Sequence, residues 1–150
     1  MHLAHYLGLL HHAEIELGEA FREVGRGHRD ESDVHAICHK LAAQCDAHAE
    51  KLGRFAERYG EDAPDEPERP HSFRGIRGGG PGLVRDLHDL HLMACECEIA
   101  WTLVGQAAHG ARDTKLLEVV EACEGETSTQ LRWLATRMKH AAPQALMVAP

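Results

Sequence analysis

The chain has 150 residues and a mass of 16.6 kDa, a length at which about two-thirds of the unfolded surface can be buried in one core without disulfides. Its formal net charge of −8, from 24 acidic and 16 basic residues, argues against nucleic acids and anionic membranes as partners, because both repel an acidic protein. Aromatic residues make up 5% of the chain and hydrophobic residues 43%, which favours helices over a β-sandwich. We expect a single all-α domain over residues 1–150.

Histidine and cysteine are the unusual residues of the composition. The 13 histidines exceed what a structural bundle needs, and imidazole is a common metal ligand, so metal binding enters as a hypothesis. The 5 cysteines have no regular spacing, no segment resembles a secretion signal, and no apolar run approaches the roughly 20 residues that span a bilayer. We expect a soluble, cytoplasmic protein with reduced thiols.

Apolar residues recur with helical periodicity in four segments, which short glycine-containing runs separate. We expect helices over about 2–25, 31–59, 82–109 and 113–141. Asp30 or Ser32 is expected to cap the second helix, Pro81 to lie in the first turn of the third, and Asp113 to cap the fourth.

The segment at about 60–81 is rich in proline, glycine and acidic residues, and it cannot sustain a helix. It is long enough to run the length of a helical bundle. We therefore expect a crossover between helices two and three rather than an up-down-up-down arrangement. The segment is either a solvated surface loop or a lid over a functional site.

Each helix contains a seam of apolar residues at alternating spacings of four and three, which is typical of a helix that faces a bundle core. Near its middle each seam is interrupted by one polar residue: Glu14, His48, Glu98 and Glu124 in turn. At a rise of about 1.5 Å per residue, the three glutamates share one level of the bundle and His48 lies within about one turn of it. Three carboxylates in a dry core repel one another unless a cation neutralises them. Oxygen ligands with an imidazole suit iron or manganese.

The helices that carry the three glutamates each offer a second, wholly apolar seam one position away. That register places Ala13, Cys97 and Cys123 in the core and moves the glutamates to the edge of the buried stripe. A buried stripe about 100° wide admits both registers, so a metal site and partly solvated carboxylates both stay open. Only for His48 does the pattern leave little choice of face.

His91 and Cys45 are the next candidate ligands. His91 shares one face of its helix with His88, Cys95 and Glu98, and this face is either ligand-bearing or simply polar. Cys45 lies one turn before the polar position of the second helix. It is either a ligand or, like the other core-facing cysteines, a small buried hydrophobic residue.

The layout resembles the ferritin-like superfamily of four-helix bundles. In that superfamily the second and fourth helices carry Glu-x-x-His, the other two carry a single Glu, and together they hold a di-iron or di-manganese centre. Here the second helix reads Cys45-Asp-Ala-His48 and the fourth reads Glu124-Gly-Glu-Thr127, so each motif is half present. These departures imply one metal ion, an atypical pair, or a vestigial site.

The resemblance implies that Glu14, His48, Glu98 and Glu124 are the metal ligands, with Thr127 placed to hydrogen-bond one of them. The chain also resembles short bacterial bundle proteins that are sometimes named for molybdopterin oxidoreductases. A molybdopterin enzyme needs a far larger fold, so that name implies at most a genomic association.

The leading expectation is metal binding in a ferritin-like core, for iron handling or for oxygen or peroxide chemistry of the ferroxidase or peroxide oxidoreductase type. One or two iron or manganese ions are expected, with zinc, or a b-type haem held through His48 or Met93, as alternatives. The other function class is a non-catalytic bundle that dimerises or docks to a partner enzyme. We expect a homodimer, because its interface would cover the apolar residues outside the favoured seams: Tyr6, Leu9, Leu90, Leu92, Ile99 and Leu103.

Overall fold

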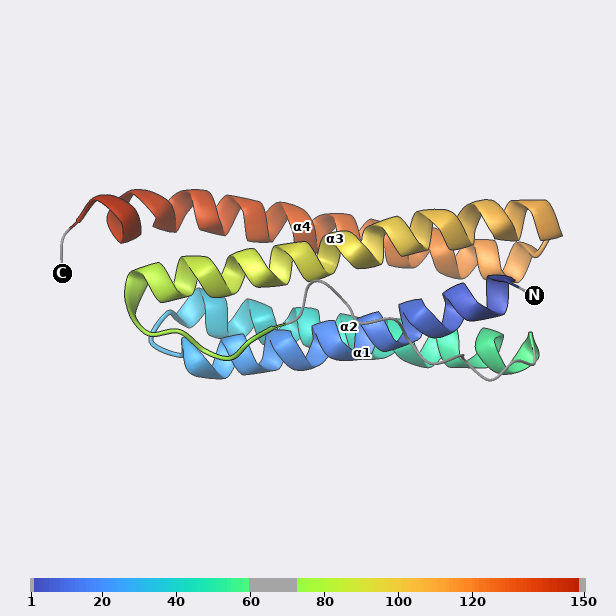
Figure 1. Cartoon of the computed structure of the whole chain (residues 1–150), viewed down its shortest axis with the longest axis horizontal. Coiled ribbons are helices and arrows are strands. Elements are labelled where there is room, and N and C mark those ends of the chain that lie inside the picture. Colours follow the sequence, from blue (N-terminus) through green and yellow to red (C-terminus); the bar gives the residue numbers. More distant parts are fainter. Residues whose placement is uncertain (1, 60–72, 149–150) are drawn as a thin grey trace.

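The computed structural model describes residues 2–59 and 73–148. Within these ranges the chain forms four helices and no strand: α1 (His2–Gly27), α2 (Ser32–Arg58), α3 (Gly79–Ala111) and α4 (Thr114–Met147). They make an elongated bundle (Figure 1), which confirms the expected all-α class. None of these helices combines the length and the apolar character that crossing a membrane requires.

The helices pack as two antiparallel hairpins, α1 with α2 and α3 with α4. The hairpins meet mainly through α1 and α3, and over a smaller area through α2 and α4. In Figure 1, α2 ends at one end of the bundle and α3 begins at the other, so these two helices run in the same direction. Most of the segment expected as a loop at about 60–81 lies outside the described residues, and residues 73–78 of it are non-helical.

The start of α2 differs from the expectation that Asp30 or Ser32 caps it. The N-cap residue is Glu31, and no side chain caps the helix. The carboxylates at this end bond to α4 instead: Arg137 donates from Nε to Asp33 at 2.7 Å and from Nη2 to Glu31 at 3.0 Å. The start of α2 is therefore tied to α4 by one arginine that bonds to two carboxylates, and it has no local side-chain cap.

The third helix begins at Gly79, earlier than the expected start near residue 82. Gly79 has a φ of 75°, which glycine adopts readily because it has no Cβ, and this sharp entry lets the helix start before the proline. Pro81 lies in the first turn, as expected. The expected cap of α4 is also confirmed, because Oδ1 of Asp113 accepts a hydrogen bond from the N–H of Leu116 at 3.1 Å.

The fourth helix continues through Pro143 to Met147, past the expected end near residue 141. A proline removes one hydrogen bond from a helix, and packing can compensate for that loss. The last turns of α4 lie against the start of α3, where a Cβ on Gly80 would meet Ala145 at 3.7 Å. This contact supports the extension of α4.

Burial decides the register of α3 and α4, which the apolar pattern leaves open. Cys97 and Cys123 are fully buried, whereas Glu98 and Glu124 are only partly buried. In both helices the wholly apolar seam therefore faces the core. The glutamates of the alternative seam lie on the outer edge.

In α1 and α2 the polar seam residues do enter the core. Glu14 is 1% exposed beside a buried Ala13, and His48 is 0% exposed. The α1 stripe is thus wide enough to include both registers. The prediction that His48 faces the core is confirmed.

Small residues let α1 and α2 approach closely. A Cβ on Gly18 would lie 3.2 Å from Cβ of Cys45, and a Cβ on Gly25 would lie 3.1 Å from Cβ of Cys38. Two turns thus repeat the same glycine-cysteine contact in an antiparallel pair. This close contact holds the neighbouring turns, which carry Glu14 and His48, side by side.

The exposed apolar residues agree with the sequence expectation in part. Tyr6, Ile99 and Leu103 are exposed, and Leu9 and Leu92 are half-buried. The expectation for Leu90 is wrong, because this residue is fully buried. Leu90 belongs to the apolar seam of α3 that faces the core.

Candidate functional site

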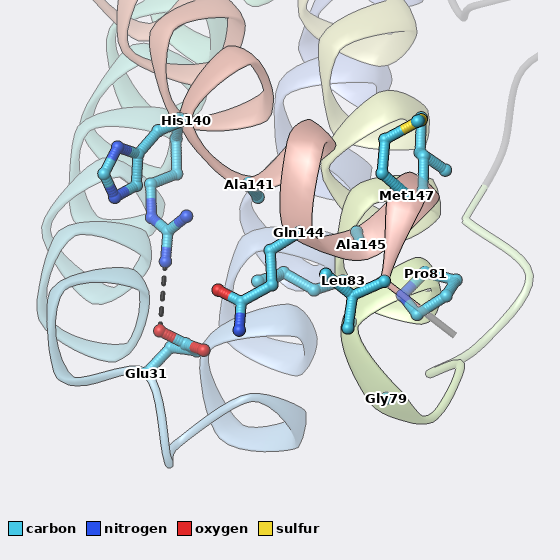
Figure 2. A pocket seen from close by; sticks show the side chains of 13 residues that line it. Glu31, Gly79, Pro81, Leu83, His140, Ala141, Gln144, Ala145 and Met147 are labelled. Atoms are coloured by element: carbon cyan, nitrogen blue, oxygen red, sulfur yellow. Dashed lines mark hydrogen bonds and ion pairs between the residues drawn. The ribbon is translucent and has the colours of Figure 1, made fainter. Parts of the chain in front are cut away.

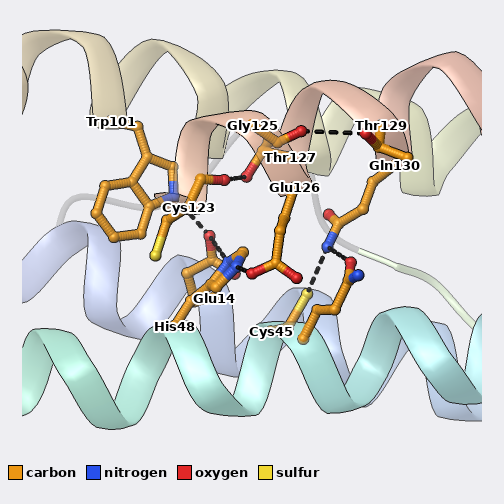
Figure 3. A network of polar contacts seen from close by, with 11 residues as sticks. Glu14, Cys45, His48, Trp101, Cys123, Gly125, Glu126, Thr127, Thr129 and Gln130 are labelled. Atoms are coloured by element: carbon orange, nitrogen blue, oxygen red, sulfur yellow. Dashed lines mark hydrogen bonds and ion pairs between the residues drawn. The ribbon is translucent and has the colours of Figure 1, made fainter. Parts of the chain in front are cut away.

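A polar cluster inside the core takes one main residue from each helix (Figure 3). Glu14 comes from α1, His48 from α2, Trp101 from α3 and Glu126 from α4. The first three are almost completely buried, whereas the side chain of Glu126 is 40% exposed. The cluster is therefore internal and reaches the surface at Glu126.

His48 lies between two carboxylates. Its Nε2 is hydrogen-bonded to Oε1 of Glu126 at 3.2 Å, and its Nδ1 lies 3.2 Å from Oε1 of Glu14, at ion-pair distance but without hydrogen-bond geometry. The indole Nε1–H of Trp101 donates to the same Glu14 oxygen at 2.8 Å. The rings of Trp101 and His48 meet edge to face, with centroids 5.9 Å apart. Trp101 thus orients both members of the buried pair.

The contacts around His48 favour its protonated form. Burial alone would lower its pKa, but contacts with Cys123 and Glu14 outweigh burial and raise the pKa of His48 to about 10. His48 is then an imidazolium at neutral pH, and its charge offsets that of the buried Glu14. In the metal-free chain, a proton supplies the positive charge for which the sequence suggests a metal ion.

A thiol and two amides continue the cluster toward α4. Burial, followed by the charge of Glu14, raises the pKa of Cys45 well above its ordinary value, so the thiol stays protonated at neutral pH. Nε2 of Gln130 donates to Oε1 of Gln44 at 3.1 Å and lies 3.8 Å from Sγ of Cys45. The contacts between α2 and α4 beside the cluster are therefore polar.

The cluster also contains unsatisfied polar atoms. Across residues 2–59 and 73–148, the buried side-chain nitrogen and oxygen atoms without a hydrogen-bond partner are Oε2 of Glu14, Nδ1 of His48 and Oε1 of Gln130. All of them belong to this one cluster. Buried groups of this kind usually bond to an ordered water or an ion. Oε2 of Glu14 and Oε1 of Gln130 can each accept a hydrogen bond from a water molecule or coordinate a cation.

The structure brings together Glu14, Cys45 and His48 from the set of sequence-predicted ligands. It places Glu98 and Glu124 apart from them, in a shallow groove lined by α3 and α4. Because α3 and α4 bury their apolar seams, the carboxylates of these two residues point toward the outer side of the bundle. The arrangement expected from the ferritin-like resemblance, with ligands from four seams at one level, is not assembled from these residues.

The remaining sequence candidates have local partners. Nδ1 of His91 lies 3.6 Å from Sγ of Cys95, one turn along the same helix. The hydroxyl of Thr127 donates to the backbone oxygen of Cys123 at 2.8 Å, so it serves its own helix. In the part of the chain that the structure describes, no three side chains from His, Cys, Asp and Glu are arranged to hold a metal ion.

Glu126 and Gln130 are members of the cluster that sequence reasoning missed. Both follow from the apolar register of α4, because that register places Cys123, Thr127 and Gln130 inside and Glu126 at the rim. The role of Trp101 as a hydrogen-bond donor to Glu14 was missed as well. A buried indole N–H needs an acceptor, and this requirement is the signal that points to Glu14.

A separate hollow of about 850 Å³ lies where α4 ends beside the start of α3 (Figure 2). Leu83, Ala141 and Ala145 form part of its wall, and the ion pair of Arg137 with Glu31 borders it. None of the residues of the buried cluster lines this hollow. It is therefore distinct from the candidate site.

Comparison of the chain with protein-family models, with curated proteins and with solved structures found no match. Arguments about function therefore rest on the residues and the geometry described above.

Proposed function

We propose that this chain is a metal-binding bundle, and that Glu14, His48 and Glu126 hold its ion, either iron or manganese. The observation that carries the proposal is the pair of buried oxygens without partners, Oε2 of Glu14 and Oε1 of Gln130. An unbonded buried polar atom costs about 1–3 kcal/mol. A cation bound to Oε2 of Glu14 would remove that cost for this oxygen and would also balance the buried carboxylate.

The donor set supports the choice of metal. Carboxylate and amide oxygens with one imidazole suit iron(II) and manganese(II), whereas thiolates favour zinc or copper(I). The raised pKa of Cys45 keeps its thiol protonated, which argues against a thiolate site. The acidic and imidazole groups do not surround one point, and His48 carries a proton at neutral pH. Binding therefore requires side chains to turn toward a shared ion and His48 to release its proton, so the affinity is expected to rise with pH. Glu126, at the surface, has the freedom to turn.

The surrounding residues would orient the ligands. Trp101 donates to Glu14, and Glu14 faces Nδ1 of His48, which leaves Nε2 directed toward Glu126. In many metal sites the ligating imidazole donates its other ring N–H to a carboxylate, and this hydrogen bond fixes the orientation of the ring. A bound iron ion would supply electron transfer to oxygen or peroxide, which is the oxidoreductase chemistry that we propose for the loaded protein.

The contact between α2 and α4 offers the ion a route. The described contacts at the level of the cluster are polar on this side, namely His48 with Glu126 and Gln44 with Gln130. An ion entering there meets oxygen atoms rather than the apolar core.

We further propose the ferritin-like crossover topology for this bundle. The parallel direction of α2 and α3 in Figure 1 supports it, because such a pair requires a connection that returns along the bundle. The composition of the cluster, with one residue from each helix, also supports the proposal, because ferritin-like bundles draw their metal ligands from all four helices.

The test measures metal binding to the full chain by calorimetry under anaerobic conditions, with ferrous and manganous ions. Glu126→Gln is expected to weaken binding by about 10- to 100-fold, because it removes a ligand charge. Glu124→Gln is the matched control, since this partly buried glutamate lies on the same helix but outside the cluster. It is expected to leave the affinity within about twofold of the wild type.

Two outcomes would contradict the proposal. If Glu124→Gln abolishes binding and Glu126→Gln does not, the ion is held by the glutamates of the outer groove. If neither ion binds to the wild-type chain or raises its thermal midpoint, the cluster is not a metal site.

A further inference from the structure

A shallow groove of about 500 Å³ follows the contact between α3 and α4. It lies on the outer edge of these helices, because their inner seams face the core. Its lining comes only from these two helices: Glu98, Ile99, Thr102, Leu103, Glu121, Glu124, Gly125 and Ser128. The metal proposal uses none of these residues, so the groove requires its own explanation.

The groove exposes aliphatic surface in the middle of a helix. Ile99 is 63% exposed and Leu103 is 45% exposed, and the two lie one turn apart on α3. Across the groove, a Cβ added to Gly125 would meet no atom within 4 Å, so this wall is open. An aliphatic side chain from another molecule can therefore contact both Ile99 and Leu103.

The rim of the groove is acidic. Glu98, Glu121 and Glu124 line it, and no ion pair joins any of them to a described residue. The contact that the structure gives Glu124 is a hydrogen bond from the hydroxyl of Thr102 at 3.3 Å. Neighbouring carboxylates without cations attract a positively charged partner.

The same charges argue against a second copy of this chain. Across a two-fold axis the groove would meet itself, and each acidic rim would face the other. Like charges brought together in an interface are unfavourable, and the net charge of −8 adds to the repulsion. The groove therefore fits a partner of opposite charge better than it fits itself.

We propose that this groove docks an amphipathic, cationic helix of a partner protein. Aliphatic residues of that helix, spaced three or four apart, would contact Ile99 and Leu103. Lysine or arginine residues on its flanks would pair with Glu98, Glu121 and Glu124. This is the helix-in-groove mode of recognition, in which apolar anchors provide affinity and flanking charges select the partner. The proposal is independent of the metal site.

The probe is a synthetic amphipathic helix about 18 residues long, with leucine on one face and lysine on its flanks. Binding to the full chain is followed by fluorescence anisotropy at low and at high salt. Ile99→Ser, and separately the double variant Glu121→Lys with Glu124→Lys, are each expected to weaken binding by about tenfold or more. The double variant should also lose most of the salt dependence.

Matched controls come from the opposite hairpin. Ile15→Ser changes another exposed isoleucine, 37% exposed on α1, and Glu19→Lys reverses another exposed charge on the same helix. Both are expected to change the affinity by less than about twofold. A peptide of the same composition, scrambled so that it has no apolar face, is expected to bind at least about tenfold more weakly.

Three results would overturn the proposal. If Ile15→Ser or Glu19→Lys weakens peptide binding as much as the groove variants do, the peptide binds nonspecifically to the acidic surface of the protein. If the scrambled peptide binds as tightly as the amphipathic one, binding is likewise nonspecific. Sedimentation that shows a wild-type dimer, which Ile99→Ser converts to a monomer, would assign the groove to a second copy of this chain. None of these results bears on metal affinity, so the two proposals fail separately.

Discussion

His48 connects the buried cluster to the pH dependence of stability. Its pKa in the folded chain is raised from the ordinary value of 6.5 to about 10. A group that binds its proton more tightly when folded stabilises the fold fully below its unfolded pKa, and this stabilisation is lost as the pH rises through the folded pKa. The contribution of His48 is therefore present below pH 6.5 and disappears toward pH 10.

We expect the unfolding free energy of the metal-free chain to fall as the pH rises from 6.5 to about 10. The contribution of one proton to this slope is at most about 1.4 kcal/mol per pH unit. His48→Gln should show a shallower slope, because it removes the titrating group. Denaturant unfolding at a series of pH values measures both slopes. Equal slopes for the two proteins would show that His48 is not protonated in the folded chain.

At the scale of the elements, the end of α3 contains an unfavourable backbone conformation. Arg112 has a φ of 53°, in the left-handed region that side chains with a Cβ rarely adopt. The turn is held by hydrogen bonds from the N–H of Arg112 to the oxygen of His109 at 3.1 Å and from the N–H of Asp113 to the oxygen of Ala108 at 3.0 Å. Glycine is the residue usually found at this position of a helix end.

Arg112→Gly is expected to stabilise the chain by about 0.5–1 kcal/mol, because glycine adopts this conformation without a steric penalty. Arg112→Ala is the control, since it removes the same charge and keeps the Cβ. It should give no stabilisation. Thermal and denaturant midpoints of the two variants measure the difference, and equal midpoints would show that the backbone conformation is not the cause.

At the scale of the whole molecule, a buried carboxylate ties the two hairpins together near one end. Asp86 of α3 is fully buried. Its Oδ2 lies 2.6 Å from Nε2 of His28, which follows α1, and accepts from the N–H of Arg77 at 3.1 Å. Its Oδ1 accepts from Nη1 of Arg77 at 2.8 Å. The same aspartate therefore holds the turn after α1, the segment before α3 and α3 itself.

Asp86→Ala is expected to destabilise the chain by about 3 kcal/mol or more, because it leaves the buried His28 ring without its carboxylate partner and removes two hydrogen bonds from Arg77. Asp89→Ala is the matched control. Its side chain is 14% exposed and bonds to the same arginine at 2.9 Å, so its loss should cost less than about 1 kcal/mol. Denaturant unfolding compares the two variants. A similar cost for both would show that the buried carboxylate does not join the hairpins.

Much of the architecture was predictable, since it depends on local patterns. The four helices and the cap at Asp113 follow from apolar spacing and from residue types at helix ends. The start of α2 was not predictable in this way, because Arg137 reaches its carboxylates from a distant part of the chain. The continuation of α4 through Pro143 likewise depends on packing against α3. Both errors occur where a long-range contact outweighs a local preference.

The sequence by itself determined the all-α class, the order of the helices and the burial of His48, because the period of apolar residues is a local property of each segment. Only the tertiary structure decided that α3 and α4 turn their apolar seams inward, and hence that Glu126 rather than Glu124 contacts His48. The physical reason is the width of the buried stripe. It includes both registers of a helix, and the position of the neighbouring helices decides which edge of the stripe is covered.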